Sequence, residues 1–505
     1  MFIESTFTPI SSCIDFVADM ASRFFRLNRE QTDDLCSTLH EHIERFDETL
    51  HVFIEAPYAD RVYRDSYYHY FSTKLGNYPK HCIRLSFFDA DFDNSAFRED
   101  ADQALLQQHF VGFIVIRPTV PQVIGRSVVS PRALKQSDFR VCVVDVPVTV
   151  NAIKLTATGF PHSSQDTETI TCAETTVWAI MEYFGHRYPN YRPVLPSEII
   201  AILRSQSYER QWPSKGLVVE QISFALRELG FATRIYARSA HGVDFLQLLS
   251  CYVESGIPVA VAITNRKNIA HALLCIGREP IESSQLLATI PRSVAKSGRT
   301  VHITDNDRLA RNFVFVDDNL PVYVKAELDH PAANYARVDW QQCEIDSFIV
   351  PLYGKVYLEA YEAKQLVENF LLIGPYPLPD EYELFFRFYL TSSRSYKEYV
   401  ATSATMQSEL KTLILALSLP KFIWVAELST NELIKHSQAN GVILLDATEA
   451  NVLYNKPLVF AAYQDALITF AEEFSDGTNV EVIQLPITPF AIYENNLKPF
   501  PNNRT

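Results

Sequence analysis

Residues 165–185 read QDTETITCAETTVWAIMEYFG, a polar segment that leads into an apolar-periodic one. Apolar side chains recur at steps of three and four, the period of an α-helix, at Ala173, Val177, Ile180, Met181 and Phe184. Gly185 favours a helix end. Cys172 is then expected in or just before the first turn, where free N–H groups and the helix dipole favour a thiolate. The segment predicts a helix that carries a candidate nucleophile, although inert buried cysteines are also common.

Composition and charge narrow the class of protein. The chain has 505 residues, 47% of them hydrophobic, which predicts a globular protein of about three domains. Its net charge of −15 lacks the basic excess that phosphate contacts require, so we expect neither nucleic acid nor an anionic membrane as a partner. The first residues do not read as a secretory signal, and no stretch reaches the ~18 apolar residues of a membrane-spanning helix.

The eight cysteines are spread along the chain without a C-x-x-C pair. This spacing is typical neither of a zinc site nor of a disulfide framework, and we expect no metal and no other cofactor. Scattered free thiols suit a reducing compartment, so the predicted location is the cytoplasm. Most of these cysteines are expected to be inert core residues.

Hydrophobic patterns divide the chain into three expected domains, with an α+β fold overall. Residues 1–150 read as a mixed α/β domain, 151–355 as helices followed by strands, and 356–505 as a β-rich α+β domain. Residues 280–311 are polar and weakly patterned, which predicts an insertion or a mobile loop. The tail 498–505 is expected to be frayed.

Side chains of the middle region have the chemistry of a cysteine-dependent catalyst, which needs a thiolate, a base, a group that orients the base, and donors for an oxyanion. Cys172 begins the predicted helix, and His271 heads an apolar strand. A later strand ends in Asp317 and Asp318, which can accept from the imidazole N–H. Gln165, on the loop before Cys172, can donate its amide to an oxyanion. Only folding can bring these distant residues together.

The order Gln, Cys on a helix, His on a strand and Asp after a later strand resembles the papain-like cysteine peptidase superfamily, over about 155–355. The closer likeness is to its compact bacterial branch, which includes the peptidases that trim bacteriocin leaders. A run common in that branch is matched by Gly256-Ile257-Pro258 through His271-Ala272 to Gly277. The resemblance implies a papain-like domain, with the cysteine helix followed by an antiparallel sheet.

The resemblance also implies roles for individual residues. Cys172 would be the nucleophile and His271 the base. Gln165 would be an oxyanion donor, although it precedes Cys172 by seven positions where the papain pattern has six. The likeness favours Asp318 over Asp317 as the carboxylate that orients the imidazole, and a shift of one residue would reverse the two.

The function expected on these grounds is hydrolysis of an amide bond in a protein or peptide substrate, through a covalent acyl-enzyme. The same residues serve transglutaminases, deamidases and acyltransferases, so acyl transfer is an alternative. A second alternative is a non-catalytic papain-like scaffold that binds partners through its flanking domains. The flanking domains are otherwise expected to select the substrate or regulate the enzyme. The oligomeric state stays open.

Three other features of the sequence are weaker candidates for a site. His162 is a rival base, but its closeness to Gln165 in sequence favours a loop role. Asp305-Asn306-Asp307 offers carboxylates without a regular ligand spacing, which is more typical of a solvated loop than of a metal site. The aromatic run 63–71 is expected to be half-buried packing rather than a binding surface.

Overall fold

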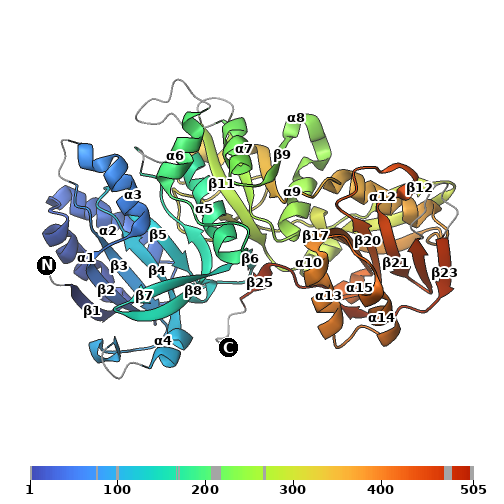
Figure 1. The fold of residues 1–505 in the computed structure, drawn as a ribbon, viewed down its shortest axis with the longest axis horizontal. Helices are drawn as coiled ribbons and strands as arrows, with labels where there is room; N and C mark the ends of the chain where they lie inside the picture. The colour runs from blue at the N-terminus through green and yellow to red at the C-terminus, as the bar shows by residue number, and fades with distance from the viewer. Residues whose placement is uncertain are drawn as a thin grey trace.

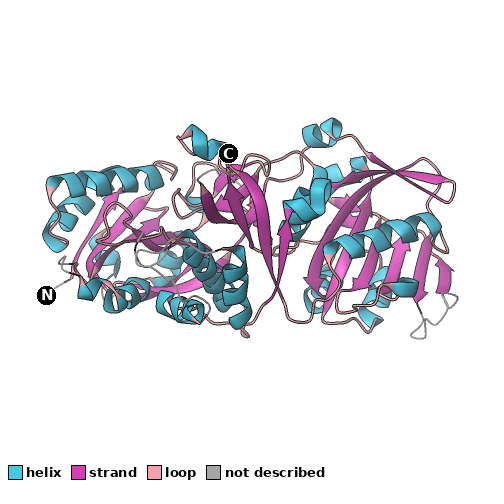
Figure 2. Ribbon diagram, turned by 90° about the horizontal axis from the view of Figure 1, so that it is seen from above, coloured by secondary structure: helices cyan, strands magenta, loops and turns pink. Residues whose placement is uncertain are grey.

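The computed structural model describes residues 3–74, 78–97, 102–166, 168, 171–205, 218–265, 269–470 and 480–500. Three large sheets follow one another along the long axis of the molecule, from the N-terminal part at one end to the C-terminal sheet at the other (Figures 1 and 2). Helices accompany each sheet, so the chain is α+β overall, as expected. None of the helices in the described ranges combines the length and the apolar character that a membrane span requires.

The first sheet has seven antiparallel strands. In spatial order they are β1 (Glu4–Pro9), β2 (His51–Tyr58), β3 (Cys82–Phe88), β4 (Phe110–Ile116), β5 (Ile124–Val129), β8 (Ile153–His162) and β7 (Val144–Val150). Its helices are α1 (Cys13–Phe24), α2 (Arg29–Ile43), α3 (Arg61–His69) and α4 (Gln103–His109). β3 and β4 are buried along their whole length; β4 is accordingly apolar throughout, whereas β3 also buries Arg84 and Ser86. The sheet continues past residue 150, to the end of β8.

The second sheet is antiparallel and holds the strands expected around His271. In spatial order they are β15 (Val324–Ala326), β14 (Phe313–Val316), β11 (Ala270–Arg278), β10 (Val259–Thr264), β16 (Glu344–Leu352) and β9 (Ala232–Ala237). Its helices are α5 (Cys172–Arg187), α6 (Pro196–Arg204), α7 (Val219–Glu228), α8 (Arg238–His241), α9 (Phe245–Glu254) and α11 (Val338–Gln341). The helix at Cys172, the strand that carries His271 and the strand before Asp317 lie where the sequence predicts them.

Two short strands from outside this region extend the second sheet. β6 (Arg140–Cys142) pairs with β11, and β25 (Leu497–Pro499) pairs with β6. The expectation of a frayed tail is therefore wrong for Lys498 and Pro499, because strand pairing holds them against the middle of the molecule. Residues 501–505 lie outside the described residues.

The third sheet has eight strands. In spatial order they are β12 (Arg292–Lys296), β13 (Arg299–Asp305), β17 (Tyr382–Ser392), β18 (Phe422–Ser429), β20 (Gly441–Asp446), β21 (Leu458–Tyr463), β22 (Ala466–Phe470) and β23 (Val480–Gln484). Its helices are α10 (Ser283–Ala288), α12 (Ala360–Ile373), α13 (Ser393–Thr402), α14 (Ser408–Ala416) and α15 (Asn431–Lys435), and β19 (Gln438–Ala439) pairs with β24 (Phe490–Ala491). Short 3-10 turns occupy Ile10–Ser12, Phe71–Thr73, Asn94–Phe97, Pro131–Ala133, Gly242–Asp244, Asn306–Arg308 and Leu453–Asn455.

Residues 280–311 are not a mobile loop. They form α10 and the hairpin β12–β13, and β13 pairs in parallel with β17. The segment is an insertion between β11 and β14, and it crosses from the second sheet to become the edge of the third. A hairpin at the edge of a sheet exposes one face to solvent, so its sequence can be polar. Because the hydrophobic pattern is weak for this reason, the sequence did not predict the hairpin.

Helix α5 links the first two sheets (Figure 1). It packs against β7 and β8 of the first sheet and against β11 of the second. Every side chain from Ala173 to Phe184 is buried as a result. At its start, the carboxylate of Glu174 accepts a hydrogen bond from the backbone N–H of Thr171 at 3.2 Å and another from the Thr171 hydroxyl. This capping box at Thr171 sets the start of the helix at Cys172.

Gly185 does not end the helix, which continues to Arg187. A Cβ atom at Gly185 would lie 2.3 Å from the backbone N of Pro193. The glycine is therefore explained by the close approach of the following loop, and not by a helix stop.

Candidate active site

The structure brings Cys172 and His271 together. Cys172 is the first residue of α5 and is half-buried, and His271 is the second residue of β11 and 5% exposed. The side chain of Cys172 lies close enough to the imidazole to contribute to raising the pKa of His271. The packing of α5 on β11 causes this pairing, because it lays the start of the helix beside the start of the strand.

The imidazole of His271 is also held by Asp317. Nε2 of His271 lies 2.9 Å from Oδ1 of Asp317. The backbone N–H of Asn319 donates to the same oxygen at 2.9 Å, and the hydroxyl of Tyr335 donates to Oδ2 at 2.8 Å. Both carboxylate oxygens are thus held, so Asp317 is fixed in position as an acceptor for the imidazole.

These contacts raise the pKa of His271. Burial alone would lower it, but the charge of Asp317, their hydrogen bond, and smaller contributions from Cys172 and Asp318 outweigh burial and raise it well above its usual range. The pKa of Asp317 moves the other way. Burial would raise it, and the charge and hydrogen bond of His271 hold it below its ordinary value. The pair therefore favours a charged imidazole beside an ionised carboxylate.

Asp318 is the carboxylate that the sequence favoured as the orienting group, but the short contact to the imidazole belongs to Asp317. Oδ1 of Asp318 lies 3.5 Å from Nε2 of His271. Within the described part of the chain, neither side-chain oxygen of Asp318 has a hydrogen-bond partner, although the residue is only 5% exposed. Burial, with the charges of Asp317 and Glu174, raises its pKa to about 7 against the opposing charge of His271.

Gln165 joins the same cluster through Asn319. Its Nε2 donates to Oδ1 of Asn319 at 2.7 Å, and Nδ2 of Asn319 lies 3.4 Å from Nε2 of His271. The guanidinium of Arg117 donates to the backbone carbonyl of Gln165 at 3.3 Å and to that of Ser164 at 3.0 Å. Gln165 is therefore anchored beside the histidine, and its role as an oxyanion donor stays a prediction.

Three residues at the site were missed by sequence reasoning. Asn319 directly follows the Asp pair, and this adjacency was the only available signal. Tyr335 and Trp340 stack with ring centroids 4.3 Å apart, and the ring of Trp340 meets the imidazole of His271 edge-on at 5.3 Å. They lie in a turn-rich stretch without periodicity, so nothing in the sequence pointed to them. Together they form an aromatic wall beside the imidazole.

The other candidate residues, His162, Asp305 and Asp307, have partners that explain them without a catalytic role. His162 is buried, and its Nε2 lies 3.1 Å from the backbone carbonyl of Asp317, so it supports the loop that carries the carboxylate. Burial is the main cause that lowers the pKa of His162. Asp305 and Asp307 both pair with Lys364, at 2.8 Å and 2.9 Å, which accounts for these carboxylates without a metal.

One group in the described ranges has donor atoms spaced for a metal ion. It comprises His271, Asp317 and Asp318, whose donor atoms all lie within 4.8 Å of one another. The same imidazole nitrogen and carboxylate oxygen form the 2.9 Å hydrogen bond. A metal at this position would compete with that bond.

Comparison with protein-family models and with curated proteins gave no match to this chain.

Proposed function

We propose that this chain is a papain-like cysteine hydrolase that cleaves an amide bond in a protein or peptide. The observation that carries the proposal is the position of His271, whose Nε2 lies 2.9 Å from Oδ1 of Asp317 and whose imidazole lies close to the side chain of Cys172 at the start of α5. A nucleophile, a base and a group that orients the base are the three parts that thiol catalysis requires.

The geometry supports a role for each group. The charged imidazole of His271 stabilises a thiolate at Cys172, which attacks the substrate carbonyl. The backbone N–H of Cys172 is one of the helix-start donors that lack an intrahelical partner, so it is available to the oxyanion. The imidazolium then protonates the leaving amine, and the acyl-enzyme is hydrolysed by water that His271 deprotonates. Asp317 keeps the imidazole oriented and stabilises its charge throughout.

The state of the cysteines suits a thiol enzyme of a reducing compartment. All eight are free thiols, and six of them are buried. The two partly exposed ones are Cys36 and Cys172. Burial, with the charges of Asp33 and Asp15, raises the pKa of Cys36, which makes it a poor nucleophile near neutral pH. The chain thus contains its own control for a test of Cys172.

The first experiment is to label the native protein with limiting iodoacetamide near neutral pH and to measure the alkylation rate of each cysteine by mass spectrometry. We expect Cys172 to react at least about tenfold faster than Cys36, and His271→Ala to abolish this difference. Equal rates at both thiols in the wild type, or fast labelling of Cys172 that persists in His271→Ala, would contradict the proposal.

A second experiment separates hydrolysis from acyl transfer. The protein is incubated with a peptide library, with and without an added amine, and the products are identified by mass spectrometry. Hydrolysis gives new carboxyl termini, whereas a transferase couples the amine and a deamidase changes only glutamine side chains. We expect new termini with the wild type and none with Cys172→Ser.

A further inference from the structure

A cavity of about 450 Å³ lies far from Cys172, between the second and third sheets. It is lined by the C-terminal end of α5 and the residues after it, by Gly256, by Tyr353, and by the start of α13 and Lys421. Arg187 ends α5, so it lies roughly 22 Å from Cys172 along the helix, at 1.5 Å per residue. A volume of this size is typical of sites for small organic molecules.

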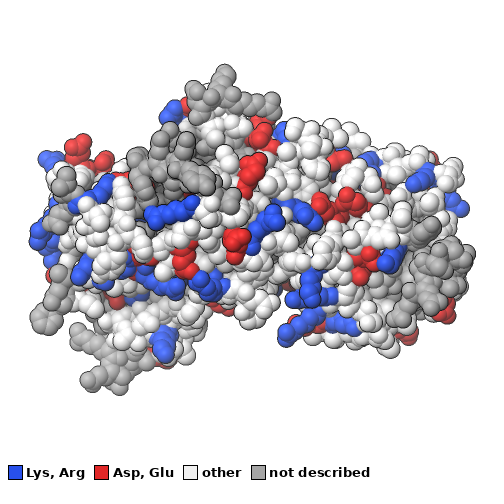
Figure 3. Space-filling model, turned by 45° about the horizontal axis from the view of Figure 1, so that its top comes forward, with Lys and Arg blue, Asp and Glu red and all other residues white. Residues whose placement is uncertain are grey.

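Three cations line this cavity: Arg187, Arg394 and Lys421. Within the described ranges none of them forms an ion pair with a carboxylate, and Glu398 is the one acidic residue of the lining that the structure describes. Nη2 of Arg187 binds the amide oxygen of Asn496, a neutral partner. An excess of unpaired positive charge is notable in a chain of net charge −15. On the face of the molecule shown in Figure 3, by contrast, positively and negatively charged side chains are interspersed.

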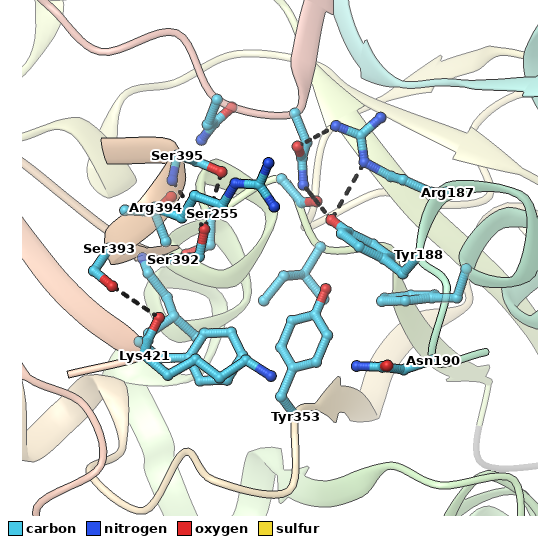
Figure 4. Close-up of a pocket in the computed structure, with 18 of the residues that line it drawn as sticks. Arg187, Tyr188, Asn190, Ser255, Tyr353, Ser392, Ser393, Arg394, Ser395 and Lys421 are labelled. Carbon is cyan, nitrogen blue, oxygen red and sulfur yellow. Dashed lines mark hydrogen bonds between the residues drawn. The ribbon is translucent and has the colours of Figure 1, made fainter. Parts of the chain in front are cut away.

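The cationic side chains and the start of α13 line the same cavity. In Figure 4, Arg187 and Tyr188 lie on one side of the cavity, Arg394 and the serines of α13 lie across from them, and Tyr353 stands between. Ser392 caps α13, and its hydroxyl accepts from the backbone N–H of Ser395 at 3.2 Å. The backbone N–H of Ser393 already donates to the carbonyl of Lys421 and that of Ser395 to Ser392, so α13 offers an anion its dipole rather than these N–H groups. The guanidinium groups that face the same space are the groups that would bind phosphate directly.

The wall of the cavity is aromatic. Tyr353 stacks on Phe422 with ring centroids 4.7 Å apart and an interplanar angle of 16°. Tyr188 and Tyr191 pack against the same Tyr353 ring, at 5.8 Å and 6.2 Å. A flat apolar ring of a ligand is best accommodated by such a surface.

We propose that this cavity binds a phosphorylated small molecule with a planar ring, of the nucleotide class. The phosphates lie between Arg394, Lys421 and the start of α13, and the ring lies against Tyr353. The ligand bridges the second and third sheets and so holds them together. This site is separate from Cys172, and the proposal does not depend on catalysis there.

The test is isothermal titration calorimetry of the full-length chain with ATP, adenosine and inorganic tripolyphosphate in turn. We expect ATP to bind with a Kd below about 100 μM and to bind more tightly than either fragment. Arg394→Glu and Lys421→Glu each weaken ATP binding roughly 10- to 100-fold, because each removes a charge-assisted contact to phosphate. Both side chains are exposed, so these variants are expected to fold.

The matched control is Lys355→Glu. Lys355 is exposed in the turn after Tyr353 but does not line the cavity, so the same change of charge leaves ATP affinity unchanged. Cys172→Ser binds ATP as the wild type does, which separates this result from any result on catalysis. Equal affinity for tripolyphosphate and ATP, binding that survives both charge reversals, or no binding of any probe at about 1 mM would overturn the proposal.

Discussion

Nε2 of His271 lies 2.9 Å from Oδ1 of Asp317, and this hydrogen bond is buried on both sides. Asp318, the next residue, approaches the same nitrogen only to 3.5 Å. The turn after β14 makes the difference, because the backbone N–H of Asn319 and the hydroxyl of Tyr335 both hold the carboxylate of Asp317. Two adjacent carboxylates thereby have different environments and, by inference, different roles.

The two carboxylates are distinguished by Asp317→Asn and Asp318→Asn, each isosteric and neutral. We expect Asp317→Asn to lower kcat/KM roughly 10²–10⁴-fold, because a neutral amide does not stabilise the imidazolium and its NH₂ group can favour the wrong tautomer of the imidazole. Asp318→Asn is expected to cost less than about tenfold, since Asp318 makes no hydrogen bond to the imidazole. Steady-state kinetics on a cleaved peptide, or alkylation rates of Cys172, give the comparison. A larger loss in Asp318→Asn would reverse the assignment.

Tyr335 is expected to act through Asp317 as a positioning residue. Tyr335→Phe keeps the ring stacked on Trp340 but removes the donor to Oδ2, and we expect roughly a tenfold lower rate. Loss of that donor also leaves more negative charge on Asp317, which raises the pKa of His271 further and shifts the pH profile of Cys172 alkylation. Tyr357→Phe, at an exposed tyrosine, is the control and leaves both rate and profile unchanged. A rate loss without any shift of the profile would indicate a merely structural role.

The pH dependence of stability tests the raised pKa of Asp318. Its folded-state value of about 7 lies above the usual ~3.9, so the folded protein binds a proton that the unfolded chain releases. The resulting penalty on folding builds up from about pH 4 to pH 7, by at most about 4 kcal/mol. The raised pKa of His271 acts in the same direction: its stabilisation is complete below about 6.5 and is lost as pH rises through its folded value.

We therefore expect the apparent Tm to fall between pH 5 and pH 8, and to fall less in Asp318→Asn than in the wild type. Thermal unfolding followed by circular dichroism at both values measures this. Asp317→Asn is a control with the opposite expected effect: it leaves the imidazolium without its partner and so lowers the Tm at pH 5. An unchanged pH dependence in Asp318→Asn would show that Asp318 is ionised in the folded protein at pH 5.

Gly185→Ala tests the contact between α5 and the following loop. The added methyl would meet the backbone of Arg192 and Pro193 at 2.4 Å and 2.3 Å, so we expect a loss of about 1–3 kcal/mol in stability despite the better helix propensity of alanine. Gly354→Ala is the control, because an added Cβ there has nothing within 4 Å. Denaturant melts of both variants provide the test, and an equal or higher stability for Gly185→Ala would refute the packing explanation.

Metal ions provide a test of how the cluster of His271, Asp317 and Asp318 works. If Cys172 is the nucleophile, treatment with EDTA leaves the alkylation and cleavage rates unchanged. Added Zn²⁺ slows both, because thiolate, imidazole and carboxylate are all zinc ligands. Loss of cleavage on chelation, restored by metal, would instead indicate a metal-dependent reaction at this cluster.

Much of the site could be anticipated because its parts have local signatures. The helix that carries Cys172 and the strand that carries His271 each follow from the spacing of apolar residues over a few turns or strand positions. The register of the Asp pair could not be anticipated in this way. Which carboxylate reaches the imidazole depends on a turn whose geometry is set by contacts to Asn319 and Tyr335.

Residue patterns alone determined the types of the main elements around the site, the presence of a thiol at a helix start and the net acidic charge of the chain. Tertiary structure alone decided that β12 and β13 belong to the third sheet, that β25 returns to the second, and that Asp317 rather than Asp318 meets His271. The physical reason is the distance along the chain over which each interaction acts. Periodicity reports which face of a segment is buried, whereas pairing between distant segments is settled by packing of the whole chain.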